Sequence, residues 1–239
     1  MKKNERAAAI VRTIVVSLIA VLFVVPLVWM VLSSLKTAPE VFARPFHWLP
    51  ARVQWQNYAT VWMNEEASML RAFANTLYIA LFSIIGQMFI SSLAAYSFAK
   101  INFKGKQVVF MLFLSSMMVP SQLTIIPRFM LFKTIGLYNN LWAIILPAFF
   151  GATSIFMLRQ FYMGLPNDLI EAAKIDGAGH LRIFLRIMLP LTKAALMSLI
   201  ILAFISSWNE YMAPLIFLVK KELYTVSQNI QWYMLDEFK

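Results

Sequence analysis

Five long apolar stretches, each bounded by basic residues, constrain this chain more than any other feature. A helix needs about 20 consecutive apolar residues to cross the hydrocarbon core of a bilayer. The stretches cover residues 13–35, 72–99, 107–127, 134–158 and 194–219. They predict an all-α fold, a polytopic transmembrane helix bundle of five spans, which forms a single membrane domain over residues 1–239.

The composition excludes most other classes of protein. Hydrophobic residues make up 61% of the chain and charged residues 13%, whereas soluble domains have about 45–50% apolar and about 25% charged residues. With no cysteine, the chain has no disulfide framework, catalytic thiol or Cys-ligated zinc. Its two histidines, His47 and His180, lie far apart in the sequence. We therefore expect neither a metal site nor a set of catalytic residues.

The basic residues indicate orientation in a membrane rather than nucleic-acid binding, although the net charge is +10. The first apolar stretch is longer than the roughly 7–15 residues of a signal-peptide core, so we expect a retained span. With the N-terminus in the cytoplasm, the inner segments hold 12 of the 21 basic residues in 55 positions, against 9 in 69 outer positions. This bias favours a cytoplasmic N-terminus. Segment 36–71 is then an external loop, whose tryptophans suit either a membrane interface or an external partner.

The largest expected cytoplasmic segment, residues 164–193, has the pattern of two short helices joined by a glycine turn. Residues 167–175 are helix formers, and Gly177 can take the positive φ that ends a helix. A second helix is expected over about residues 180–188, ended by Pro190. Two such helices are too short to form their own core. They must lie against lipid, the spans of the chain or a cytoplasmic partner.

The same segment resembles the EAA loop of ABC importer permeases. The matching positions are Glu171-Ala172-Ala173, Gly177, Ile187 and Leu189-Pro190, all at the spacing of that signature. The sequence SWNEYMAPLIFL at residues 207–218 is similar to the fifth span of the carbohydrate-type permeases, specifically the smaller partner of maltose-type systems. The resemblance covers nearly the whole chain. Subunits of that family usually have six spans, whereas five are expected here.

The resemblance implies that residues 164–193 form a coupling loop, which docks on a separate ATPase subunit. The implied coupling residues are Glu171, Ala172, Ala173, Asp176, Gly177, Leu181, Phe184, Leu185, Ile187, Leu189 and Pro190. Leu181, Phe184 and Leu185 would supply apolar contact with the ATPase. The implied partners are ATPase subunits, expected to be two, a second homologous permease subunit and an extracytoplasmic substrate-binding protein. The lipid bilayer surrounds the subunit, and no nucleic acid is expected.

One acidic residue, Glu210, lies inside a predicted span. Insertion scales penalise a charge at mid-bilayer by roughly 2.5–3.5 kcal/mol, so an ionisable residue there is a functional candidate. Trp208 and Asn209 beside it, with Gln87 and Tyr96 of the second span, complete the candidate substrate pathway. Glu210 could instead pair with a second permease. Small polar residues such as Gln122 also commonly join helices.

The resemblance therefore implies a membrane-spanning permease subunit of an ATP-driven importer that moves a sugar or oligosaccharide inward by alternating access. The chain has no GxxxxGK[ST] sequence. It is therefore expected to be no enzyme and to bind no cofactor, with ATP and Mg on the partner ATPase. The expected location is the bacterial inner membrane. The alternative is an ion-coupled secondary transporter, which would need ionisable residues within the spans and paired repeats.

Overall fold

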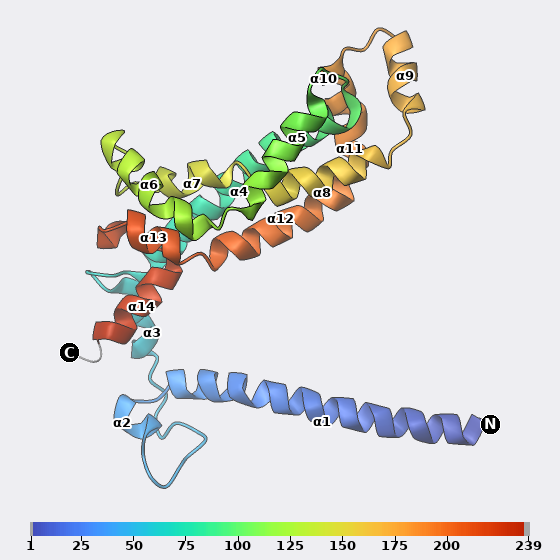
Figure 1. The fold of residues 1–239 in the computed structure, drawn as a ribbon. Helices are drawn as coiled ribbons and strands as arrows, with labels where there is room; N and C mark the ends of the chain where they lie inside the picture. The colour runs from blue at the N-terminus through green and yellow to red at the C-terminus, as the bar shows by residue number, and fades with distance from the viewer. Residues whose placement is uncertain (1, 237–239) are drawn as a thin grey trace. The chain divides into compact units, whose positions relative to one another are not determined.

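The computed structural model describes residues 2–236, and every regular element in this range is helical, which confirms the all-α class. The chain divides into two compact units, residues 2–64 and residues 65–236 of the described range. Figure 1 shows their elements by label. Each unit is described by itself below.

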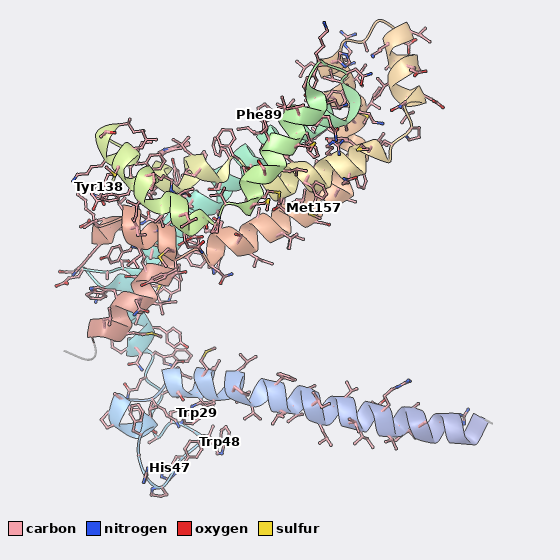
Figure 2. The ribbon with its side chains drawn as sticks, viewed as in Figure 1. Trp29, His47, Trp48, Phe89, Tyr138 and Met157 are labelled. Atoms are coloured by element: carbon pink, nitrogen blue, oxygen red, sulfur yellow. The ribbon has the colours of Figure 1, made fainter. Side chains whose placement is uncertain are left out.

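The first unit consists of one long helix and a folded loop. Helix α1 covers Lys2–Ser34, and the loop carries α2 (Ala38–Val41) and α3 (Gln56–Met63). Lys36 is 3% exposed, and its Nζ donates to the carbonyl of His47 at 2.5 Å and lies 4.6 Å from the Trp29 ring centre. Trp48 packs edge-on against Trp29 (Figure 2). The loop is thus fastened to the end of α1 by a buried cation and aromatic rings.

The second unit is built along one central helix, α4 (Met69–Lys100). It packs against α7 (Trp142–Ala148), α8 (Ala152–Met163) and α12 (Lys193–Trp208). The remaining elements are α5 (Lys106–Ser115), η1 (Ser116–Met118), α6 (Ser121–Thr134), α9 (Asp168–Ile175), α10 (His180–Ile183), the π-helical turn η2 (Phe184–Met188), α11 (Leu189–Leu191), α13 (Met212–Phe217), η3 (Lys221–Leu223) and α14 (Val226–Asp236).

Several expected spans are broken in the structure. Three helical stretches are long and apolar enough to cross a membrane, and two bent pairs raise the number to five if each pair is one span. The helix over 107–127 breaks before Pro120, and the two parts meet at 96°. Proline has no N–H to continue the backbone ladder and restricts the residue before it, which explains the break. The number of crossings stays a prediction.

The fourth and fifth stretches also differ from their predicted bounds. Residues 135–141 form a turn rather than the start of a helix, with positive φ at Gly136 and Asn139. Asn139 is held there because its Oδ1 accepts the N–H groups of Val219 and Lys220, each at 3.0 Å. The fifth stretch is interrupted after Trp208. Hydropathy alone cannot detect these turns, because it registers no backbone conformation.

Candidate functional site

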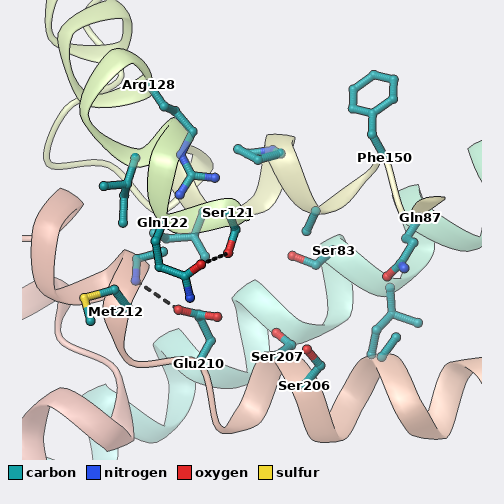
Figure 3. Close-up of a pocket in the computed structure, with 18 residues that line it drawn as sticks. Ser83, Gln87, Ser121, Gln122, Arg128, Phe150, Ser206, Ser207, Glu210 and Met212 are labelled. Carbon is teal, nitrogen blue, oxygen red and sulfur yellow. Dashed lines mark hydrogen bonds between the residues drawn. The ribbon is translucent and has the colours of Figure 1, made fainter. Parts of the chain in front are cut away.

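A cavity of about 440 Å³ opens between α4, α6, α7 and the break between α12 and α13. It lies beside the middle of α4, and Figure 3 shows its walls. The polar lining residues come from three stretches of the chain, in α4, in α6 and at the end of α12 with the break after it: Ser83, Gln87, Ser121, Gln122, Arg128, Ser206, Ser207 and Glu210. Its size suits a small ligand or part of a larger one.

The helix break places Glu210 in the cavity wall. Helix α12 ends at Trp208, and α13 begins at Met212. In the gap, the Glu210 Oε1 accepts the backbone N–H of Ala213 at 2.9 Å, which caps the first turn of α13. One carboxylate oxygen is therefore fixed by the backbone. Broken helices that line cavities are the usual place for non-helical backbone at membrane depth.

The opposite wall comes from α6, which contributes Ser121, Gln122 and Arg128. The Arg128 guanidinium carbon lies 5.0 Å from the ring centre of Phe217, a residue that is fully buried. This cation–π contact holds one face of the guanidinium. In Figure 3, Arg128 extends from α6 toward the side of the cavity on which Glu210 lies, with Gln122 between them. The two walls thus present opposite charges to the same space.

Helix α4 supplies the third wall through Ser83 and Gln87. Gln87 Nε2 donates to Ser154 Oγ of α8 at 3.0 Å, so its amide is oriented by a second helix. This close approach requires Gly151, because a Cβ there would lie 2.1 Å from Gln87 Nε2. The cavity is therefore shaped by side chains whose positions depend on the packing of α4 against α8.

The structure brings together only some of the residues predicted for a substrate pathway. Glu210 and Gln87 line the cavity. Trp208 packs against Phe73 and Phe204, and Asn209 Nδ2 donates to the Ile205 carbonyl. Neither of these two residues is part of the lining.

Tyr96 belongs to another part of the molecule. It is 3% exposed, lies toward the C-terminal end of α4 and contacts His180 through its hydroxyl, 3.3 Å from Nδ1. Its contacts therefore join α4 to segment 164–193 and not to the cavity. They also give the exposed His180 a partner within the chain.

The glycine turn in segment 164–193 has the geometry that the sequence predicted. Gly177 has φ +75°, its N–H donates to the Lys174 carbonyl, and the Ala178 N–H donates to the Ala173 carbonyl. These two bonds form a Schellman motif, in which a glycine in the left-handed region ends the helix. The second helix differs from the prediction, because Pro190 lies inside α11 and the helical run continues to Leu191. A π-helical turn before Pro190 accommodates the ring.

The predicted coupling residues divide into an outer and an inner set. Phe184 is 2% exposed and packs on the Tyr96 ring at 5.4 Å, so it supports the segment from inside instead of facing a partner. Ala173 is also buried, while Ile187 and Leu189 are half-buried. The exposed members are Glu171, Ala172, Asp176, Gly177, Leu181, Leu185 and Pro190.

One hydrophobic cluster joins this segment to the helices that carry the cavity. Ile183, Phe184 and Met188 pack in the same core as residues of α4, α8 and α12. Lys100 adds a polar clamp, since its Nζ donates to the Leu165 carbonyl at 2.7 Å and to Asn167 Oδ1 at 2.6 Å. Along α4, Gln87 and Lys100 are about 20 Å apart at 1.5 Å per residue. The cavity and the segment are therefore separate features of one packed unit.

Sequence reasoning missed Arg128 and Ser83 as cavity residues. In the sequence, Arg128 is the basic residue that bounds the third apolar stretch, and Ser83 lies inside the second stretch. The sequence does not separate Arg128 from a membrane-boundary residue, because only the structure shows that its helix continues to Thr134. Ser83 carries no signal either, because only the fold decides which face of α4 meets the cavity.

Comparisons with known proteins agree on one family. Residues 87–238 match the family model described as binding-protein-dependent transport system inner membrane component. The chain is 34% identical over 216 residues to the arabinooligosaccharides transport system permease protein AraQ of Bacillus subtilis. The matched region covers 90% of this chain and 76% of AraQ. It is 30% identical to the diacetylchitobiose uptake system permease protein NgcG of Streptomyces coelicolor, over 96% of this chain and 76% of NgcG.

A third relative and a solved structure extend this result. The sn-glycerol-3-phosphate transport system permease protein UgpE of Yersinia enterocolitica is 30% identical, over 90% of this chain and 78% of its own length. The fold is similar, with a TM-score of 0.83, to a chain in the crystal structure of a bacterial ABC transporter involved in the import of the acidic polysaccharide alginate. That match has 23% identity and covers 99% of this chain and 82% of the other.

Proposed function

The chain belongs to the family of binding-protein-dependent transport system inner membrane components, and from this premise we propose that it carries a sugar or oligosaccharide across the bacterial inner membrane. It is a membrane-embedded permease subunit of an ABC importer. The observation that carries the proposal is the polar cavity beside the middle of α4, in the same packed unit as segment 164–193. Two of the relatives named above are permeases for oligosaccharides.

Movement of segment 164–193, called the EAA segment here, would be transmitted to the cavity walls through the shared hydrophobic cluster. Because Ile183, Phe184 and Met188 pack with α4 and α8, the segment cannot shift far without shifting these helices or losing its burial. A close-packed interior transmits displacement rather than absorbing it. Alternating access then follows if an outside partner pulls on the segment while α6 and α13, on the far side of the cavity, stay in place.

The exposed side chains of the segment suit a docking surface for an ATPase subunit. Ile175 is 87% exposed, Leu181 65% and Leu185 48%. Burying a large apolar side chain contributes about 1.5–3 kcal/mol. Shifting a two-state equilibrium from 1:99 to 99:1 needs about 5.5 kcal/mol of differential binding. Burial of these three side chains in one state of the ATPase is of that order, whereas a single surface ion pair is not.

The remaining parts of the proposal follow from the family. ATP and Mg bind to the ATPase subunits, expected to be two, while this chain binds no cofactor. A second permease completes the membrane part, and an extracytoplasmic binding protein delivers the substrate. The N-terminus lies in the cytoplasm, on the same side as the EAA segment, which agrees with the excess of basic residues in the expected inner segments.

Purification of the tagged chain from its native membrane, followed by mass spectrometry, tests this proposal. We expect stoichiometric recovery of an ATPase and a second permease. Gly177→Pro should lose the ATPase and keep the second permease, because proline cannot take φ +75° and has no N–H for Lys174. Gly136→Ala is the control for strain in the left-handed region, because Gly136 has φ +77° and lies in the turn between α6 and α7, outside segment 164–193. Recovery of the wild-type chain without an ATPase would contradict the proposal.

A further inference from the structure

Two side chains in the cavity wall hold buried polar atoms that lack a hydrogen-bond partner. Ser83 is 4% exposed, and neither its Oγ nor the Arg128 Nε is paired within the described part of the chain. Buried polar groups in folded proteins are nearly always paired, because an unmet one costs the full desolvation of that group. Both residues belong to the lining of one cavity, and a ligand in that cavity could supply the missing partners.

The charges of the lining restrict what that ligand can be. Arg128 and Glu210 are the two charged side chains in the wall, so the cavity has no net formal charge. Arg128 is fixed by the Phe217 ring and Glu210 by the Ala213 N–H. Both charged side chains are therefore held in the cavity wall, and a ligand meets both charges together. An anionic ligand drawn to Arg128 would meet the Glu210 carboxylate across the same space, which opposes its binding.

We propose that this cavity binds an uncharged polyhydroxylated ligand, with Arg128 and Ser83 donating to its oxygens and Glu210 accepting from its hydroxyl groups. A hydroxyl both donates and accepts, so it satisfies a guanidinium and a carboxylate equally well. The inference rests on the proposed function and deepens it, because it places direct ligand contacts on this subunit and assigns the ligand a neutral charge. Arg128 is then the residue that determines specificity.

A pair of serine variants separates a ligand contact from a packing role. Ser83→Ala removes the unpaired hydroxyl in the cavity, while Ser91→Ala removes another unpaired hydroxyl of α4, fully buried and outside the lining. The complete importer is reconstituted in proteoliposomes, and ATP is supplied on the side of the membrane that carries the ATPase subunits. Arabinotriose and diacetylchitobiose are the neutral probes, and sn-glycerol 3-phosphate is the anionic probe. We expect Ser83→Ala to lower neutral transport per ATP hydrolysed about threefold or more, with unchanged thermal stability.

Charge variants test the role of Arg128. Arg128→Gln should lower neutral transport per ATP about tenfold or more, because it removes a charge-assisted donor. Lys133→Gln, on the same helix and outside the cavity lining, is the control and should leave transport unchanged. Glu210→Gln should raise the transport of sn-glycerol 3-phosphate relative to the neutral probes, since Arg128 is then unopposed.

The outcomes distinguish this inference from the proposed function. Wild-type transport of the anionic probe in preference to both neutral ones, or neutral transport that Ser83→Ala and Arg128→Gln leave unchanged, overturns the inference while ATP-driven import stands. Absence of ATP-driven transport of every probe overturns the proposed function and the inference with it. Neutral transport lowered by Ser83→Ala and Arg128→Gln, but not by Ser91→Ala and Lys133→Gln, supports the inference.

Discussion

At the residue scale, two glycines set how closely the central helix approaches its neighbours. A Cβ on Gly86 would lie 2.1 Å from the Phe149 ring, and one on Gly151 would lie 2.1 Å from the Gln87 amide. Neither glycine has a positive φ, so close approach, rather than backbone conformation, explains them. Nothing in the sequence distinguishes these two from the turn glycines, because the need for them arises only from tertiary packing.

We expect Gly86→Ala to destabilise the protein by about 1–3 kcal/mol, the usual cost of overpacking. The added methyl overlaps the Phe149 ring, so either the ring rotates or α7 shifts away from α4. The measurement is the midpoint of thermal unfolding in detergent. Gly179→Ala, where the added methyl meets nothing within 4 Å, is the control. Phe149→Ala in the Gly86→Ala background should restore part of the loss, and a double variant no more stable than Gly86→Ala would refute the explanation.

The ion pair of Glu66 with Lys221 predicts a pH dependence at the other end of α4. The hydrogen bond and charge of Lys221, at 2.5 Å, hold the pKa of Glu66 below its ordinary value. Since the folded-state pKa is the lower one, the pair stabilises the fold above the unfolded pKa of Glu66. That contribution is lost as the pH falls through the folded pKa. The pair is exposed, so we expect a small effect.

Lys221→Gln should raise the pKa of Glu66 toward its ordinary value, as measured by carbon NMR of labelled glutamate. Lys220→Gln is the neighbouring control, because Lys220 contacts Asn139 only through its backbone N–H, and it should leave the pKa of Glu66 low. A Glu66 pKa that is the same in wild type and Lys221→Gln would show that the pair does not persist in solution.

At the element scale, segment 164–193 shows both the reach and the limit of sequence reasoning. The turn at Gly177 was predictable because a left-handed helix end has a strong residue preference. The inward position of Phe184 was not, since its spacing with Leu181 and Leu185 placed all three on one face of a regular helix. A π-helical turn over Phe184–Met188 changes that register and leaves Phe184 buried while Leu181 and Leu185 are exposed.

The Lys100 clamp fixes where this segment begins. Lys100→Met should loosen residues 165–172, because it removes charge-assisted bonds to the Leu165 carbonyl and Asn167, each contributing about 1.5–3 kcal/mol. Hydrogen exchange measured by mass spectrometry should show faster exchange at the start of α9. Lys104→Met, an exposed lysine in the adjacent loop, should leave exchange there unchanged. Equal exchange in wild type and Lys100→Met would mean that the clamp does not hold α9.

Helix breaks at the same scale explain what hydropathy missed. Residues 194–219 look like one continuous span in the sequence. In the structure the helix is interrupted after Trp208, and this break places Glu210 in the cavity wall. The one acidic residue in a predicted span, Glu210, does lie in the cavity wall. Arg128 could not be recognised in the same way, because a basic residue at the edge of an apolar stretch usually marks a membrane boundary.

At the scale of the whole molecule, the second unit combines a polar cavity with segment 164–193, which lies about 20 Å away along one helix. The sequence predicted the class of fold and the family, since both depend on long apolar stretches and on one fixed-spacing motif. The sequence did not predict which residues form the cavity wall. Ser83, Arg128 and Glu210 come from α4, α6 and the break after α12, and only the packed helices bring them together.

The central claim is that ATP hydrolysis on a partner drives transport through this subunit, and reconstituted uptake tests it most directly. The complex is placed in proteoliposomes with the external binding protein and a labelled neutral oligosaccharide, in the presence of ionophores that abolish proton and sodium gradients. Uptake that requires ATP and is insensitive to the ionophores is the result we predict. Uptake that persists without ATP and stops with the ionophores would contradict the account and favour an ion-coupled transporter.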